Sequence, residues 1–310
     1  MLKSLKRIDI VLTVYNQERI IERVLYGIFR NTTTPFNLIL IFVGCIDRTK
    51  PRALRYIKKY KPRIMINLIT KDIPNLHETK SNNIGFRLAG EDYMITIQDD
   101  MVINEYGWER RLTYPLRKFD DVLAITARSA HNIVEINKDI EEYSEQAARE
   151  CNTLSRDNFA VRDIINRGPV AFRMDYLSKL NYLNEDYAPC NLDDADISLR
   201  AWKKYKWKVG AYWIDYISRR EWGKTRENNA IGMVTVRSNS KNAEQINYQH
   251  GDYINGNIKH TENIRIDESE IDYKSKAVLK RPMYILFYPI RITKKDMRKS
   301  IIKIIRKLIP

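Results

Sequence analysis

The chain has 310 residues, of which 44% are hydrophobic and 30% charged, a composition typical of a folded globular protein. It holds only 11 glycines and contains neither a GxGxxG nor a GxxxxGK(S/T) phosphate loop, which argues against a Rossmann dehydrogenase or a P-loop enzyme. The formal net charge is +15, but nearly half of this excess lies near the C-terminus, so it does not characterise the body of the protein.

The cysteines and the hydropathy pattern indicate the cellular environment of the chain. Cys45, Cys151 and Cys190 lie far apart and without CxxC spacing, which argues against a disulfide framework and a zinc site and favours a reducing compartment. The N-terminal residues lead directly into a strand pattern, with no long apolar signal region. The sequence has no run of about 18 apolar residues, so we expect no transmembrane helix.

Strand and helix patterns alternate through the first hundred residues. Short apolar runs predict buried strands, and apolar positions recurring every three to four residues predict helices between them. In chain order these are strands at 8–14, 38–43, 64–69 and 93–97 and helices at about 18–30, 50–60 and 79–89. The alternation predicts an α/β fold with a mostly parallel sheet covered by helices.

A second unit follows residue 100. We expect helices at about 107–118, 174–180 and 194–205, and strands at 122–127, 168–172 and 208–214. Residues 128–163 are polar and irregular, which makes them a candidate for a mobile loop over a site. Residues 223–270 are rich in Asn, Ser and charged residues and carry a weak structural signal, and we expect residues 227–270 to form a loop-rich segment.

Two acidic clusters stand where an α/β enzyme binds ligands. Asp99 and Asp100 follow the apolar strand at 93–97, and Asp193-Asp194-Ala195-Asp196 comes just before or at the start of the later helix. Grouped carboxylates repel one another and are costly to desolvate, so such clusters coordinate a cation, manage a proton or lie in solvent. Ligands of open α/β sheets bind outside the carboxyl ends of the strands, which favours a metal site at Asp99 and Asp100.

Five segments of the chain, in this order, resemble the inverting GT-A glycosyltransferases of family 2. They are Val11-Leu12-Thr13-Val14-Tyr15-Asn16-Gln17-Glu18, Ser81-Asn82-Asn83-Ile84-Gly85, Gln98-Asp99-Asp100, Gly168-Pro169-Val170-Ala171-Phe172-Arg173 and Asp193-Asp194-Ala195-Asp196-Ile197. The resemblance covers roughly residues 8–226. It implies a GT-A domain at 1–270, with a nucleotide-binding half at 1–100, an acceptor and catalytic half at 101–226 and a closing segment at 227–270.

The resemblance also implies which residues form the site. Asp99 and Asp100 would hold a Mn²⁺ or Mg²⁺ ion, and Asp194 would act as the catalytic base, with Asp193 as the reserve. The donor-binding residues would be Thr13, Tyr15, Asn16, Glu18, Val43, Asn83, Gln98 and Asp99. The residues facing the diphosphate or the acceptor would be Trp222, Lys224 and Arg226, and His250 would be a further metal ligand.

These assignments match the chemical needs of sugar transfer. The two donor phosphates gain negative charge as the glycosidic bond breaks, and a hard divalent cation with carboxylate ligands offsets that charge. Inversion by direct displacement needs a base that takes the proton of the acceptor hydroxyl. Such a base typically raises the reaction rate about 10²–10⁴-fold. The structural alternatives are a turn for Asp99 and Asp100, a helix cap for Asp193 and Asp194, a solvated loop for Lys224 and Arg226, and an ordinary surface position for His250.

Three departures from the family pattern bear on function. Phe42 and Val43 stand where members commonly carry two acids, so the sequence does not identify the nucleotide base of the donor. Gln98 replaces the first carboxylate of the DxD motif, so metal binding falls on the two aspartates after it. The sequence has no QxxRW motif, which predicts transfer of one sugar and not processive synthesis. The rival hypotheses are a nucleotidyltransferase of similar fold and a degenerate glycan- or membrane-binding module.

The last segment, residues 271–310, differs from the rest. Residues 291–310 hold eight basic residues against one acid, Asp296, with apolar residues at helical spacing between them. This pattern is typical of a helix in the interface of an anionic membrane; packing on the catalytic domain or on a partner chain is the alternative. We expect a cytoplasmic, peripheral membrane enzyme that moves a sugar from a nucleotide-diphosphate sugar to a glycan or lipid-linked acceptor. We expect no nucleic-acid partner, since one would not explain the acidic clusters.

Overall fold

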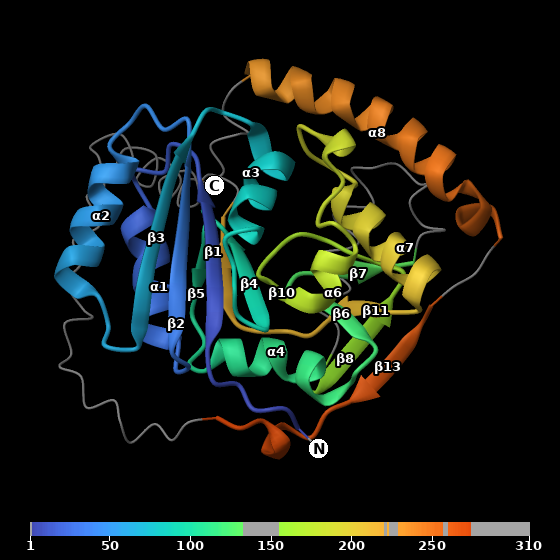
Figure 1. Cartoon of the computed structure of the whole chain (residues 1–310), viewed down its shortest axis with the longest axis horizontal. Coiled ribbons are helices and arrows are strands. Elements are labelled where there is room, and N and C mark those ends of the chain that lie inside the picture. The colour runs from blue at the N-terminus through green and yellow to red at the C-terminus, as the bar shows by residue number, and fades with distance from the viewer. Residues whose placement is uncertain (1, 133–154, 220–221, 223–228, 257–259, 274–310) are drawn as a thin grey trace, which may run out of the picture. The chain divides into compact units, whose positions relative to one another are not determined.

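The structure is a computed structural model, and it describes residues 2–132, 155–219, 222, 229–256 and 260–273 (Figure 1). For residues 229–240 it describes the backbone only. The chain divides into two units, Met1–Tyr273 and Lys274–Pro310, and all the described residues belong to the first. Most of the predicted tail and much of the predicted mobile loop lie outside the described residues.

Four parallel strands form the first half of the central sheet, in the spatial order β4-β1-β2-β3. They are β1 (Ile8–Val14), β2 (Phe36–Val43), β3 (Met65–Ile73) and β4 (Tyr93–Gln98), connected through α1 (Ile21–Asn31), α2 (Thr49–Tyr60) and α3 (His77–Phe86). The helices α1 and α2 pack on one face and α3 on the other, so both faces of β1 and β2 are buried (Figure 1). Such strands are continuous apolar runs, which the sequence reveals directly.

The second half of the sheet is mixed. The strand β10 (Val170–Arg173) runs antiparallel between β4 and β6 (Val122–Thr126), followed by β11 (Lys208–Ala211), β8 (Asn158–Arg162) and β13 (Glu262–Arg265). Two small sheets pair β5 (Met101–Ile103) with β12 (Tyr216–Ser218) and β7 (Ala130–His131) with β9 (Ile164–Ile165). The helices are α4 (Trp108–Lys118), α6 (Met174–Lys179), α7 (Asp193–Tyr205) and α8 (Asn229–Asn255), with 3-10 turns at Glu185–Tyr187 and Glu268–Glu270. The predicted α/β class is confirmed.

The segment expected to be loop-rich contains α8, a helix of 27 residues. The prediction for residues 227–270 is therefore wrong over most of its length, and residues 158–162, expected to be irregular, form β8. The reason is tertiary: Ile246, Tyr253 and Ile254 of α8 are spread thinly along the sequence but pack together against α7, and packing supplies most of a helix's stability. Among the described helices, none is long and apolar enough to cross a membrane.

Buried arginines of α4 fasten the end of the described chain to the body. Arg111 pairs with Glu268 at 2.7 Å, and Arg110 and Arg117 pair with the two carboxylate oxygens of Asp272 at 2.6 and 2.7 Å. The guanidinium groups are buried while the acids are partly exposed, so losing either acid would leave a buried charge without its partner, which is destabilising. Residues up to Asp272 are therefore part of the folded body.

We expect Gly210→Ala to destabilise the fold. A Cβ at this position of β11 would lie 2.4 Å from the carbonyl oxygen of Ala160 and 2.6 Å from the Phe159 ring, between two paired strands. Such overpacking costs about 1–3 kcal/mol, which calorimetry would detect as a lower melting temperature. Gly90→Ala is the matched control, because nothing lies within 4 Å of a Cβ there. Equal melting temperatures of the two variants would contradict this account of the β8–β11 contact.

Candidate active site

The turn after β4 meets the loop after β1. Asp99 accepts hydrogen bonds from the backbone amide of Tyr15 at 2.7 Å and from Nε2 of Gln17 at 3.1 Å. The same Gln17 amide group donates to the carbonyl oxygen of Trp222 at 2.9 Å. The structure thus brings together Asp99, the predicted donor-side loop and Trp222, which lie far apart in the sequence.

The electrostatics at Asp99 suit a cation. Burial and the neighbouring carboxylates of Asp100 and Glu78 raise the pKa of Asp99 to about 7, although the hydrogen bonds from Tyr15 and Gln17 act to lower it. A divalent ion stabilises crowded carboxylates, and oxygen is the ligand atom that Mg²⁺ and Mn²⁺ prefer. Asp99 and Asp100 therefore fit the predicted metal role by their chemistry. In the part of the chain that the structure describes, no three His, Cys, Asp or Glu side chains form a group that could hold a metal ion.

Two predicted donor-binding residues join the loop after β1 to the turn after β2. The Oδ1 atom of Asn16, a residue in the left-handed conformation (φ 50°), accepts from the amide of Ile46 at 2.9 Å. The amide of Glu18 donates to the Asp47 carboxylate at 3.2 Å. Val43, at the end of β2, is 5% exposed and packs in the apolar core on the α3 face of the sheet. Its predicted contact with the donor stays a prediction.

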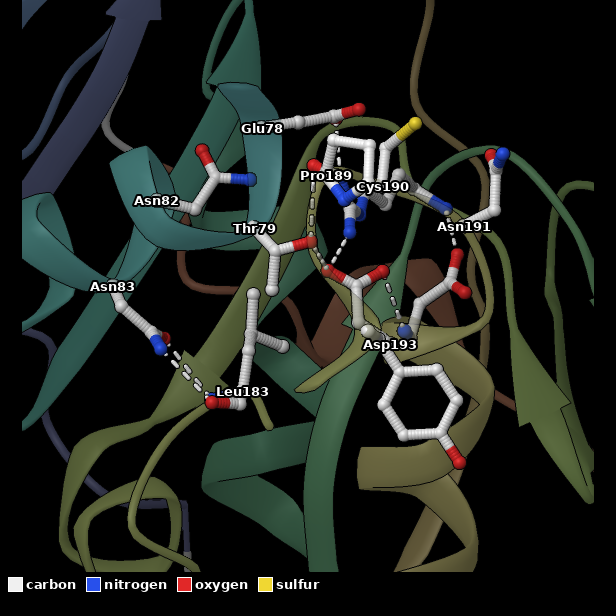
Figure 2. A network of polar contacts seen from close by, with 12 residues as sticks. Glu78, Thr79, Asn82, Asn83, Leu183, Pro189, Cys190, Asn191 and Asp193 are labelled. Carbon is white, nitrogen blue, oxygen red and sulfur yellow. Dashed lines mark hydrogen bonds and ion pairs between the residues drawn. The ribbon is translucent and has the colours of Figure 1, made fainter. Parts of the chain in front are cut away.

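Thr13 and Asn83 tie α3 to its neighbours. The hydroxyl of Thr13 donates to Asn82 on α3 at 2.9 Å. The side chain of Asn83 exchanges two hydrogen bonds with the backbone of Leu183, at 2.9 and 3.0 Å (Figure 2). These contacts connect α3 to β1 and to the segment that precedes α7, and the predicted donor contacts of both residues stay predictions.

Asp193 begins α7 and is 0% exposed. Its Oδ2 atom forms an ion pair with Arg167 and accepts from the Thr79 hydroxyl at 2.7 Å (Figure 2). Its Oδ1 atom accepts from the backbone amide of Asp194 at 3.0 Å. A buried, paired carboxylate of this kind stabilises the local structure and is poorly placed to meet an incoming hydroxyl.

Asp194, the next residue, is only partly buried. Its Oδ2 atom accepts from the backbone amide of Arg167 at 3.1 Å, and its Oδ1 atom from the amide of Ala195 at 2.9 Å. Burial raises the pKa of Asp194, although the charge of Arg167 and the amide hydrogen bonds oppose the shift. A carboxylate with a raised pKa, a fixed orientation and accessible surface has the properties of a general base.

Sequence reasoning missed Glu78 and Arg167, which connect the two acidic clusters. Nε2 of Gln98 donates to Oε1 of Glu78 at 3.0 Å, and Arg167 pairs with the same oxygen at 2.7 Å. Burial would raise the pKa of Glu78, but the charge and hydrogen bond of Arg167 lower it. Because Arg167 also holds Asp193, a continuous polar chain runs from the end of β4 to the start of α7. The sequence offered one clue to Arg167, namely its position directly before the Gly168-Pro169 segment.

The residues still to be placed are His250, the Trp222 side chain, Lys224 and Arg226. Nε2 of His250, on α8, contacts Oδ1 of Asp196 at 2.9 Å, so it is paired with an acid other than the two of the predicted metal site. The Trp222 side chain packs against the main apolar core. Lys224 and Arg226 lie outside the described residues.

Comparison with known proteins identifies the family of the chain. A family model described as Glycosyl transferase family 2 matches residues 9–176. Among solved structures, GalNAc-T7 with UDP, GalNAc and Mn²⁺ is 13% identical with a TM-score of 0.51, covering 68% of this chain and 43% of that one. This likeness supports the GT-A type of fold. No curated protein matches the sequence significantly.

Two further similar structures come from a bacterium and an archaeon. TarS 1-349 of S. aureus in complex with UDP is 12% identical with a TM-score of 0.45, over 66% of this chain and 57% of that one. The mannosyltransferase PcManGT from Pyrobaculum calidifontis in complex with GDP-Man and Mn²⁺ is 13% identical with a TM-score of 0.47, over 66% and 56%. The match therefore covers less than two thirds of the length of each of these two proteins.

Proposed function

Because the chain belongs to glycosyl transferase family 2, we propose that it transfers one sugar from a nucleotide-diphosphate sugar to an acceptor hydroxyl, with inversion. The observation that carries the proposal is the polar chain Gln98–Glu78–Arg167–Asp193. It links the carboxylates at the end of β4, suited to a donor diphosphate, to the acidic start of α7, suited to an acceptor.

Asp99 and Asp100 would hold the divalent ion, Mn²⁺ or Mg²⁺. When bound, the ion would offset the negative charge that the leaving diphosphate gains. The residues of the chain have their own part in donor binding: the Asp99 carboxylate fixes the loop after β1 through Tyr15 and Gln17. That loop and the turn after β2 would receive the nucleotide. Because Phe42 and Val43 are apolar, other residues would recognise the nucleotide base.

Asp194 would take the proton from the acceptor hydroxyl. The backbone amides of Arg167 and Ala195 orient its carboxylate, and the buried Asp193 with Arg167 supports the turn around it. The acceptor is proposed to be a glycan or a lipid-linked glycan of a surface polysaccharide, and the protein to work at the cytoplasmic face of a membrane. Transfer of a single sugar fits the lack of a QxxRW motif in the sequence.

The experiment that tests the function is a screen of nucleotide sugars. In the presence of Mn²⁺, the correct donor should raise the melting temperature, and a tighter-binding donor should raise it further. Incubation with acceptors should then release nucleoside diphosphate. Release of pyrophosphate would instead indicate a nucleotidyltransferase. Donor binding without turnover on any acceptor would favour a degenerate binding module.

Deletion of residues 283–310 should release the protein from anionic liposomes and leave transfer to a soluble acceptor intact. The deleted residues are basic and apolar at helical spacing, whereas the ion pairs of Asp272 with α4 remain. Co-sedimentation should also weaken at high salt, which screens the lipid charge, and Ile301→Glu with Ile305→Glu should nearly abolish it. An aggregated deletion variant or unchanged liposome binding would contradict the membrane role of the tail.

A further inference from the structure

The segment that leads into α7 has an unfavourable backbone conformation. Asn191 and Leu192 are both left-handed, with φ of 75° and 63°, and Leu192 caps the helix that begins at Asp193. Leucine is disfavoured in this conformation because its Cβ crowds the backbone. Tertiary contacts are therefore needed to hold the segment in this shape.

One buried side chain of α8 supplies such contacts. Nδ2 of Asn242 lies 2.9 Å from each of three carbonyl oxygens, those of Tyr187, Cys190 and Asn191, and the residue is 0% exposed. An amide nitrogen has two hydrogens, so the three carbonyls share them. Buried carbonyls that lose their donor are destabilised, so Asn242 favours the one conformation in which all three oxygens converge.

The helix that carries Asn242 is itself fixed against α7. Asn242, Ile246 and His250 are spaced by four residues, so they lie along one face of α8. Ile246 packs in an apolar cluster with α7, and His250 contacts Asp196 at 2.9 Å. The Tyr187 hydroxyl also donates to Gln249 at 2.9 Å. The position of Asn242 relative to the start of α7 is thus set by contacts on both sides.

A second group of contacts comes from α3. The backbone amides of Glu78 and Thr79 donate to the carbonyl oxygen of Pro189 at 3.1 and 3.2 Å. The Thr79 hydroxyl reaches on to Asp193 (Figure 2). Residues 187–191 are therefore held by α3 through one carbonyl and by α8 through three others.

We infer that Asn242 is a positioning residue of the active site. By binding the carbonyls of residues 187, 190 and 191 it sets the path of the chain into α7, and thereby the direction in which Asp194 faces an acceptor. The inference rests on the proposed function, because it takes Asp194 as the base. Its effect should fall on the transfer step and spare donor binding, since the donor-side loops come from the ends of β1, β2 and β4.

The test compares three substitutions of Asn242 with a control on the same helix. Asn242→Asp keeps the shape but replaces the donor with a carboxylate that repels the three carbonyls, and Asn242→Ala removes the donor. Both should lower kcat at least about tenfold, since small misplacements of catalytic groups have large effects, with KM for the donor and the affinity for UDP or GDP nearly unchanged. Asn242→Ser retains one hydrogen-bond donor, so its kcat should lie between those of the wild type and Asn242→Ala. It serves as the test if the other two variants do not fold. Tyr248→Ala, at a position 91% exposed, should behave as wild type.

A second readout does not depend on turnover. Cys190 is a partly buried cysteine within the segment, and its thiol should be alkylated faster in Asn242→Ala than in wild type, as measured by mass mapping of its peptide. Full kcat in a folded Asn242→Asp or Asn242→Ser variant, equal losses of kcat and nucleotide affinity, or unchanged Cys190 reactivity would each overturn the inference. Wild-type protein that transfers no sugar, with faster alkylation in the variant, would support the positioning contact and count against the proposed function.

Discussion

Asp194→Asn should lower kcat by about 10²-fold or more while the affinity for the nucleoside diphosphate stays nearly unchanged. The amide has the size of the carboxylate and keeps one of its two acceptor oxygens, so it retains the hydrogen bond from the backbone amide of either Arg167 or Ala195, but it cannot take a proton from the acceptor hydroxyl. Steady-state kinetics and calorimetry with UDP or GDP measure the two effects separately. Because burial raises the pKa of Asp194, wild-type kcat should fall as the pH decreases through that raised value, where the carboxylate becomes protonated.

Asp193→Asn is the matched control for this prediction. Asp193 is fully buried and pairs with Arg167, so its neutralisation removes one of the two carboxylates that form ion pairs with this buried cation, the other being Glu78. We expect a lower melting temperature, by analogy with broken buried ion pairs that cost on the order of 3 kcal/mol. An inactive but stable Asp193→Asn beside an active Asp194→Asn would reverse the assignment of the base. If neither variant lost rate, the two acids would serve as a helix cap alone.

Asp100→Asn should abolish turnover and the metal-dependent part of nucleotide binding, with the fold intact. The expected loss is large because the leaving diphosphate would lose the cation that offsets its charge, a contribution of several kcal/mol. Asp100 is a cleaner position than Asp99, whose carboxylate also binds Tyr15 and Gln17. Calorimetry with UDP or GDP, with and without Mn²⁺, should show a gain in affinity in wild type and none in the variant.

The exposed acid Asp252 provides a control for charge alone. Its side chain is 72% exposed and pairs with Lys203 on the protein surface, so Asp252→Asn should retain both metal-dependent binding and turnover. Full activity of the wild type in EDTA would refute the metal role of Asp99 and Asp100. Turnover by Asp100→Asn at the wild-type rate would refute the assignment of that residue.

The sequence by itself determined the first half of the fold. The strands at 8–14, 38–43, 64–69 and 93–97 were predicted within a few residues of β1 to β4, because each contains a short apolar run. The strands β1 and β2 are buried on both faces, whereas the edge strand β3 is mostly exposed. The acids after β4 and at the start of α7 were also visible, since a run of carboxylates beside an apolar segment is a local pattern. Local patterns of burial and charge are what a single sequence displays.

The tertiary structure alone decided how the acids differ. Asp193 and Asp194 are adjacent and chemically identical, yet one is buried against Arg167 and Thr79 and the other keeps accessible surface. The partners that make this difference come from α3, where Thr79 lies 114 residues before Asp193, and from the segment before β10, which holds Arg167. The helix α8 was missed for the same reason, because its stability comes from packing on α7. Ion pairs and packing between distant segments leave no periodic signal in the sequence, so they become apparent only when the chain is folded.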